Sequence, residues 1–192
     1  MYCSNSAREA FAMSSKTKLK AGMQAPDFTA ADANGREYSL EQLRGRKSAA
    51  LVFLRYAGCP ICQLSLQQLK NAHAEFEARN AQVMAFVQSP AQTLLQSGVV
   101  SAFPFPIIPD PDERIYKLFG VGSGGLGALL APRTLQRGIQ ATLKGHKQGK
   151  LEGNTWQLPG DFIVDPQGVL KLARVGRDMG DNLSPDKLLS YL

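Results

Sequence analysis

The amino-acid sequence predicts a single α/β domain in which helices flank a central mixed β-sheet. Two observations lead to this prediction. Short apolar runs of strand length alternate with segments of helical periodicity, and a hairpin pattern followed by a helix closes the chain. Strands separated by helices favour parallel pairing, whereas a hairpin adds antiparallel strands, so the sheet is expected to be mixed. A chain of 192 residues is long enough for one such domain with a substantial core.

The first half of the chain supplies two predicted strands and the helix between them. Residues 49–55 (AALVFLR) form a continuous apolar run, as in a buried central strand, and residues 83–87 (VMAFV) form a second one. Between them, apolar residues recur at spacings of three, four and seven, which indicate a helix with one buried face. They are Leu66, Leu69 and Phe76, in a segment that begins at Pro60.

The second half supplies a short helix, the hairpin and the closing helix. Residues 113–119 (ERIYKLF) predict a helix that Gly120 ends. Residues 162–164 and 169–175 flank the turn sequence DPQG and predict two antiparallel strands. Ser184 and Pro185 then provide an N-cap and a first helical residue.

The N-terminal 20 residues show no recognisable pattern, and we expect a poorly ordered tail at 1–20 before a domain at 21–192. Met13 is considered beside Met1 as the first residue of the natural protein. Charged Arg8 and Glu9 interrupt the only apolar cluster, so a secretory signal is not expected. No run approaches the length of a membrane span. A cytoplasmic protein without membrane contact is the resulting expectation.

Cys59 and Cys62, at the joint between the first strand and its helix, allow three interpretations: a structural disulfide, half of a metal site, or a reactive dithiol. A reducing cytoplasm disfavours the disulfide scaffold. A closed zinc site needs four ligands, and Cys3, His73 and His146 stand at no ligand spacing. We therefore expect a reactive dithiol, with no metal and no cofactor.

The residues around the pair suggest how it would react. Gly58 frees the backbone at the turn, Cys59 takes the N-cap position, and Pro60 starts the helix. The helix dipole would lower the pKa of Cys59 and make it the attacking thiolate. Cys62, one turn further on, is expected to be less exposed and to resolve the intermediate. Arg55 either adds positive field at the site or is a solvated charge at the strand end.

Several segments together resemble a known family. The run GCPIC after a strand resembles the thioredoxin superfamily active site. The frame resembles the peroxiredoxin branch, the AhpC/TSA family, and within it the peroxiredoxin-like subfamily that carries CxxC. Residues 22–28 resemble its opening strand, and the segments 34–45, 105–121 and 162–168 also resemble that family. The resemblance implies a thioredoxin-like fold and a thiol-based antioxidant oxidoreductase. It further implies a peroxide or disulfide substrate and an external thiol reductant of the thioredoxin or glutathione type. The oligomeric state stays open, with a dimer possible.

The sequence departs from that family at the active site. The proline and the hydroxyl residue that precede the family's cysteine are replaced by Val52 and Tyr56, counted back from Cys59. Tyr56 could replace the hydroxyl if its ring points inward. Pro159 stands where the family has an arginine, as in thioredoxins, and implies a cis Leu158–Pro159 bond beside the dithiol. Trp156 is a candidate substrate wall or, alternatively, a core residue.

Residues 122–157 match no part of the family pattern and are expected to form an insertion near the site. Its glycine-rich start lacks the context of a dinucleotide-binding loop. The tract 133–150 contains five Lys or Arg residues and no acid. It is either a solvated surface or a surface that steers anionic partners; nucleic acid is a weaker alternative, because no groove-reading motif accompanies the charge.

Three functions remain open from the sequence alone. The first is a Cys59/Cys62 dithiol–disulfide cycle that reduces peroxides. The second is a thioredoxin-like reductase of protein or small-molecule disulfides without peroxidase activity. The third is a non-catalytic binding module built on the same fold.

Overall fold

The computed structural model describes residues 18–192. The expectations for the tail at 1–20 and for Met13 as a start therefore lie almost wholly outside the described residues. Across residues 18–192, no helix combines the length and apolar character that crossing a membrane requires.

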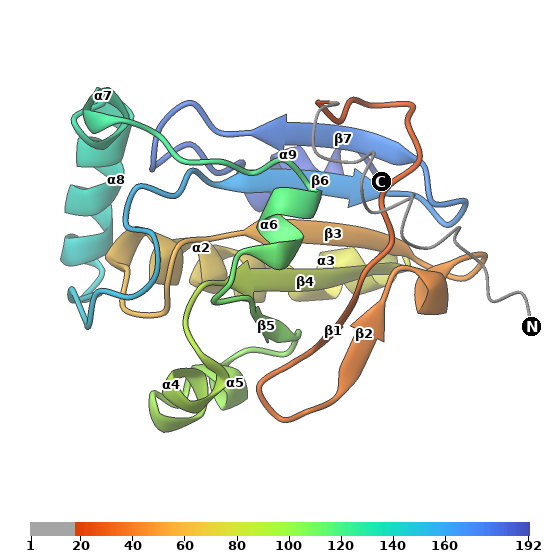
Figure 1. Ribbon diagram of the computed structural model, residues 1–192, viewed down its shortest axis with the longest axis horizontal. Coiled ribbons are helices and arrows are strands. Elements are labelled where there is room, and N and C mark those ends of the chain that lie inside the picture. Colours follow the sequence, from red (N-terminus) through yellow and green to blue (C-terminus); the bar gives the residue numbers. More distant parts are fainter. Residues whose placement is uncertain (1–17) are drawn as a thin grey trace, which may run out of the picture.

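A five-stranded mixed sheet forms the centre of the domain (Figure 1). Its strands lie in the order β5 (Ile107–Pro109), β4 (Ala81–Val87), β3 (Ser48–Phe53), β6 (Gly160–Val164) and β7 (Leu170–Val175). β3, β4 and β5 are parallel, whereas β6 is antiparallel to both β3 and β7. The predicted mixed sheet and the predicted hairpin are confirmed.

Helices cover both faces of this sheet. α6 (Arg114–Leu118) lies on one face, and α2 (Pro60–Asn71), α3 (His73–Ala78) and α9 (Pro185–Leu189) lie on the other (Figure 1). Successive side chains of the central strand β3 point to opposite faces of the sheet and pack in two hydrophobic clusters. Ala50 and Val52 pack in the cluster with α2, while Leu51 and Phe53 pack in the cluster with α6. Burial on both faces explains the uninterrupted apolar run in this strand.

The predicted helix after Pro60 is two helices, because the backbone leaves helical geometry at Ala72. The predicted cap of α9 is confirmed, since the Ser184 side chain accepts a hydrogen bond from the Lys187 N–H. The opening strand was misplaced: Gln24 forms only an isolated bridge with Val169, and the first hairpin pairs β1 (Thr29–Ala31) with β2 (Glu37–Ser39).

Besides the strands β1, β2 and β5, five helical elements were not predicted from the sequence. They are the 3-10 helix η1 (Glu41–Leu43) and the helices α4 (Ala91–Gln96), α5 (Val99–Ala102), α7 (Leu126–Leu129) and α8 (Pro132–Leu143). The last two lie within residues 122–157. Pro132 at the first helical position was a usable signal for α8.

α8 is fastened to the domain through side chains rather than through the sheet. Arg137 donates to Gln68 Oε1 of α2 at 3.1 Å and to the Asn182 carbonyl at 3.0 Å. Arg133 forms an ion pair with Asp181. Two of the five basic residues of the tract are thus structural, which corrects the reading of the whole tract as a solvated surface.

A buried carboxylate links these contacts to the sheet. Asp161 on β6 is fully buried and accepts hydrogen bonds from the Leu183 N–H at 3.0 Å and from Arg174 Nη1 at 3.3 Å. Arg174 also pairs with Asp181 at 2.5 Å. Burial raises the pKa of Asp161 to about 6, although these donors act in the opposite direction.

This pKa predicts a pH dependence of stability. Because the pKa of Asp161 is about 6 when folded, against an ordinary 3.8, its contribution to stability is complete below about pH 4. As the pH rises through 6 this contribution is lost, which lowers the free energy of unfolding by about 3 kcal/mol for a pKa difference of about two units. Urea unfolding of the wild type and of Asp161→Asn between pH 4 and 7 measures this free energy. The difference in free energy of unfolding between the two proteins should change over this pH range.

Asp165→Asn is the matched control, because burial raises the pKa of Asp165 but hydrogen bonds from the Val169 N–H and Lys171 together outweigh it and lower this pKa. Its contribution has the opposite sign, present at neutral pH and lost on acidification. Parallel profiles for wild type and Asp161→Asn would contradict the assignment.

Candidate active site

The dithiol lies at the joint between β3 and α2, as predicted. Cys59 is the N-cap of α2, its Sγ accepts a hydrogen bond from the Cys62 N–H at 3.3 Å, and Pro60 begins the helix. Both cysteines are free thiols in the structure. The segment after β4 holds the joint in place, since Ser89 Oγ accepts the Ala57 N–H at 2.9 Å.

Arg55 resolves the alternatives left by the sequence, because its side chain turns inward. It is 9 % exposed, and Nη2 donates to Cys59 Sγ at 3.1 Å. Its backbone N–H also lies 3.4 Å from Cys62 Sγ. Nη1 is held by the Thr155 carbonyl at 3.3 Å and by Met179 Sδ at 3.4 Å. Arg55 makes no ion pair with a carboxylate anywhere in residues 18–192, so the two sulfurs are its nearest counter-charges.

The ionisations of the two thiols are coupled, because the sulfurs lie beside each other and beside Arg55. Burial and the hydrogen bond with Cys62 raise the pKa of Cys59 well above its ordinary value, against the lowering effect of Arg55. Burial alone would also raise the pKa of Cys62. The hydrogen bond from Cys59, the charge of Arg55 and backbone N–H groups outweigh burial and lower this pKa to about 6. The pair therefore shares one proton between its two sulfurs, and Cys59 as the attacking thiolate stays a prediction.

The relative exposure of the cysteines was also predicted wrongly. Cys59 has no exposed surface, and Cys62 is 4 % exposed. The insertion covers the joint, because the Gly149 N–H donates to the Gly58 carbonyl at 2.8 Å and Gln148 Nε2 reaches the same oxygen at 3.3 Å. A Cβ on Gly58 would lie 2.7 Å from the Lys150 carbonyl oxygen. Gly58 is needed for this close approach and not for backbone freedom at the turn.

The three remaining predicted site residues lie differently from one another. Tyr56 is buried, and its hydroxyl accepts a hydrogen bond from Gln148 Nε2 at 3.3 Å rather than contacting a sulfur. Burial raises its pKa. The Leu158–Pro159 bond is trans, which corrects the expected cis bond and removes Pro159 from the site. Trp156 is 41 % exposed, so it is not a core residue, and its side chain does not line the cavity beside the dithiol.

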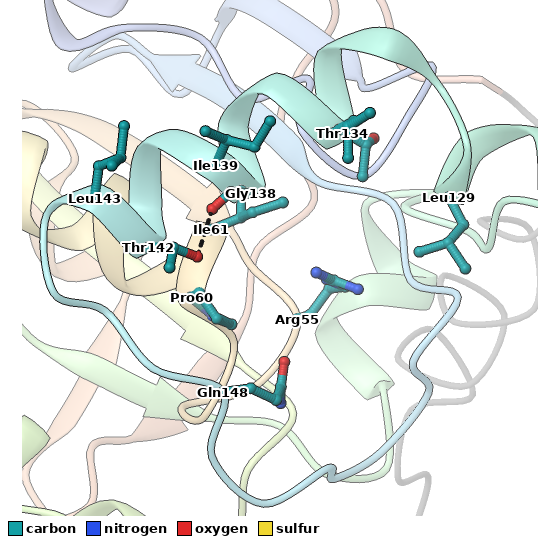
Figure 2. Close-up of a pocket in the computed structure, with 11 residues that line it drawn as sticks. Arg55, Pro60, Ile61, Leu129, Thr134, Gly138, Ile139, Thr142, Leu143 and Gln148 are labelled. Carbon is teal, nitrogen blue, oxygen red and sulfur yellow. Dashed lines mark hydrogen bonds between the residues drawn. The ribbon is translucent and has the colours of Figure 1, made fainter.

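That cavity, of about 510 Å³, opens between α8 and the start of α2 (Figure 2). Arg55 lies at its inner end, and most of its wall is aliphatic. The lining residues are Arg55, Pro60, Ile61, Leu129, Thr134, Leu135, Gly138, Ile139, Thr142, Leu143 and Gln148.

Sequence reasoning missed the residues that hold Arg55 and cover Cys59. Thr155 and Gln148 come from the insertion, whereas Met179 comes from the loop after β7. These contacts join residues 90 to 124 positions apart. No local spacing could have indicated them. Only the apolar spacing of four along α8 was a readable signal for the cavity wall.

Comparison with known proteins adds the family. Residues 21–173 match the sequence profile described as "AhpC/TSA family". This chain belongs to the AhpC/TSA family. The similar proteins named below are redox proteins by name, and together with the family this makes the chain a thiol-dependent oxidoreductase of the peroxiredoxin type. The third function left open by the sequence, a non-catalytic binding module, is not favoured.

Three similar proteins illustrate the range of the family and its neighbours. Alkyl hydroperoxide reductase E of Mycobacterium tuberculosis is 35 % identical over 105 residues, which cover 54 % of this chain and 69 % of that protein. Thiol-disulfide oxidoreductase ResA of Geobacillus thermodenitrificans is 27 % identical over 110 residues, or 56 % of this chain and 61 % of that one. The crystal structure of peroxidoxin BcpB from Mycobacterium tuberculosis superposes with a TM-score of 0.65 at 20 % identity, covering 90 % of this chain and 96 % of that chain. This likeness confirms the thioredoxin-like fold.

The close contact at Gly58 generates a prediction about access to Cys59. Gly58→Ala should push residues 149–150 away and raise the rate of Cys59 alkylation by iodoacetamide, by about tenfold for a loss of 1.4 kcal/mol in the closed contact. Mass spectrometry of the labelled peptide measures the rate. Gly127→Ala is the control, because a Cβ there meets nothing within 4 Å. Equal rates in wild type and Gly58→Ala would show that the contact does not limit access.

The position of Arg55 predicts its effect on thiol ionisation. Arg55→Met removes the cation that favours the thiolate, so the first pKa of the dithiol should rise, by about 1–3 units for a charge at this distance. The ultraviolet absorbance of the thiolate as a function of pH measures this pKa. Arg44→Met, at an exposed arginine paired with Glu41, should leave it unchanged. An unchanged pKa in Arg55→Met would remove the proposed electrostatic role.

Proposed function

We propose that this protein reduces peroxides through a redox-active Cys59–Cys62 pair, with Cys59 as the attacking sulfur. The contact of Arg55 Nη2 with Cys59 Sγ at 3.1 Å is the observation that carries the proposal. The guanidinium stabilises the Cys59 thiolate, and its further N–H groups can donate to a peroxide oxygen bound beside the sulfur. Arg55 thus takes over what the family's missing hydroxyl and arginine would supply.

The shared proton determines the first step. With one proton between the two sulfurs, Cys62 carries the proton and Cys59 is the thiolate beside the charge of Arg55. Cys59 Sγ attacks the peroxide, the O–O bond breaks, and a sulfenic acid forms at Cys59. The leaving oxygen takes the proton from Cys62 and departs as water or an alcohol.

The second step closes the disulfide. The Cys62 thiolate attacks the sulfur of the sulfenic acid, an S–S bond forms, and hydroxide leaves and is protonated to water. An external thiol reductant, of the thioredoxin or glutathione type, then returns both sulfurs to thiols. This need for a thiol supply suits a cytoplasmic location, where such reductants keep cysteines reduced.

Burial favours peroxide over a protein disulfide as the first substrate. Cys59 has no exposed surface under residues 148–150, so the disulfide of a folded partner does not reach its sulfur without displacing this cover. A peroxide needs far less space. Reduction of disulfides stays the second candidate, because the CxxC pair at a helix N-terminus also suits it and the ResA relative is named for that chemistry.

Single-cysteine variants separate the roles. Cys59→Ser should slow the reaction of the reduced protein with hydrogen peroxide by at least about 100-fold, because the nucleophile is gone. Cys62→Ser should still form the Cys59 sulfenic acid, yet it should not turn over with thioredoxin as reductant. Stopped-flow kinetics measures the first rate, and mass spectrometry identifies the oxidised residue.

The opposite pattern would assign the attack to Cys62. A wild-type rate no greater than that of a free thiol would reject peroxidase activity and leave disulfide reduction as the function. Cys59→Ala, compared with Cys59→Ser, controls for hydrogen bonding by the serine hydroxyl.

A further inference from the structure

The exposed apolar surface of this protein is concentrated on the insertion. Among the described residues, nine large apolar side chains are exposed, and eight of them lie within residues 122–157. Leu135, Ile139 and Leu143 follow one another at a spacing of four and form a continuous stripe along α8. Such a stripe would normally face the core of the domain, but this one faces a cavity beside the dithiol.

The cavity has the dimensions and lining of a small-molecule site. Its volume of about 510 Å³ lies within the range typical of such pockets. Aliphatic side chains of α8 form one wall, and Pro60 and Ile61 at the start of α2 form the opposite wall (Figure 2). The walls therefore suit a hydrocarbon chain.

The inner end of the cavity is cationic and has a free donor. Arg55 is about nine-tenths buried, and within residues 18–192 its Nε has no hydrogen-bond partner. An N–H group in such a place favours an acceptor oxygen, because leaving it unpaired costs free energy. The surrounding tract adds exposed Lys144 and Lys147, whereas Lys150 pairs with Glu152 at 3.8 Å. The charge of the site thus complements an anion.

We propose that this cavity binds an anionic single-chain amphiphile of the carboxylate type. Its hydrocarbon chain lies along Leu135, Ile139 and Leu143, and its carboxylate pairs with the guanidinium of Arg55 in the cavity wall. A second copy of the chain is disfavoured as the occupant, since a protein surface cannot reach a guanidinium that is only 9 % exposed.

Redox state modulates this binding. Arg55 also contacts Cys59, so a thiolate in the pair competes with the carboxylate for the same guanidinium. Affinity should be higher when the cysteines carry no charge. Binding itself does not require the dithiol reaction, but any role of the ligand as a substrate or as a competitor of peroxide rests on the proposed function.

The test uses decanoate, which has no redox chemistry, in isothermal titration calorimetry with the full chain. We expect saturable binding to the reduced wild type and severalfold tighter binding to the Cys59→Ser/Cys62→Ser variant, which has no thiolate. Acetate, which lacks the chain, and decyltrimethylammonium, which carries the opposite charge, should bind at least about tenfold more weakly.

Surface variants locate the site without risk to the fold. Leu135→Gln and Ile139→Gln should each weaken decanoate binding by about tenfold, the effect of losing one buried aliphatic contact. Leu95→Gln is the matched control, because Leu95 on α4 is 50 % exposed and Ile139 is 54 % exposed. Arg55→Met should weaken decanoate binding and leave the fold, checked by circular dichroism, intact.

Three results would overturn the proposal. They are no decanoate binding by either the wild type or the double-serine variant, equal affinity for the cationic amphiphile, and equal losses in Ile139→Gln and Leu95→Gln. None of them depends on peroxide turnover. Decanoate binding by a protein that fails the peroxide test would reject the proposed function and retain the pocket.

Discussion

The buried contact between the Arg55 guanidinium and Cys59 Sγ is the interaction around which the site is organised. A cation removed from water is costly unless anions and hydrogen-bond acceptors replace the water. Here a thiolate, the Thr155 carbonyl and Met179 Sδ serve in this role. They come from the N-terminus of α2, from the insertion and from the loop after β7, so one side chain holds together three distant parts of the chain.

The sheet makes this arrangement possible by fixing where β3 ends. Both faces of β3 are buried, and the strand passes directly into the loop that carries Arg55 and Cys59. The insertion is then secured from two sides. Arg133 and Arg137 attach α8 to the C-terminal loop and to α2, while Gly149 reaches the backbone of Gly58. Substrate access, the position of Arg55 and the cavity wall therefore all depend on residues 122–157.

Local patterns predicted what local forces determine. The apolar run of β3, the capping of α2 by Cys59 and Pro60, and the β6–β7 hairpin are all set by neighbouring residues, and each was found. The side chain of Arg55, the trans bond before Pro159 and the order of the two thiol pKa values depend on tertiary contacts. α8 is the exception, because Pro132 and the apolar spacing of four were local signals that indicated a helix and were not used.

The absence of a carboxylate partner for Arg55 in residues 18–192 also has a consequence for the equilibrium between the two redox states. In the reduced protein the thiolate compensates the buried positive charge. Forming the disulfide removes that compensation and leaves the guanidinium with neutral acceptors only, which disfavours the oxidised protein. A pair whose reduced form is stabilised in this way has a higher reduction potential and acts as a stronger oxidant. Even a mildly reducing thiol pool is then sufficient to regenerate it.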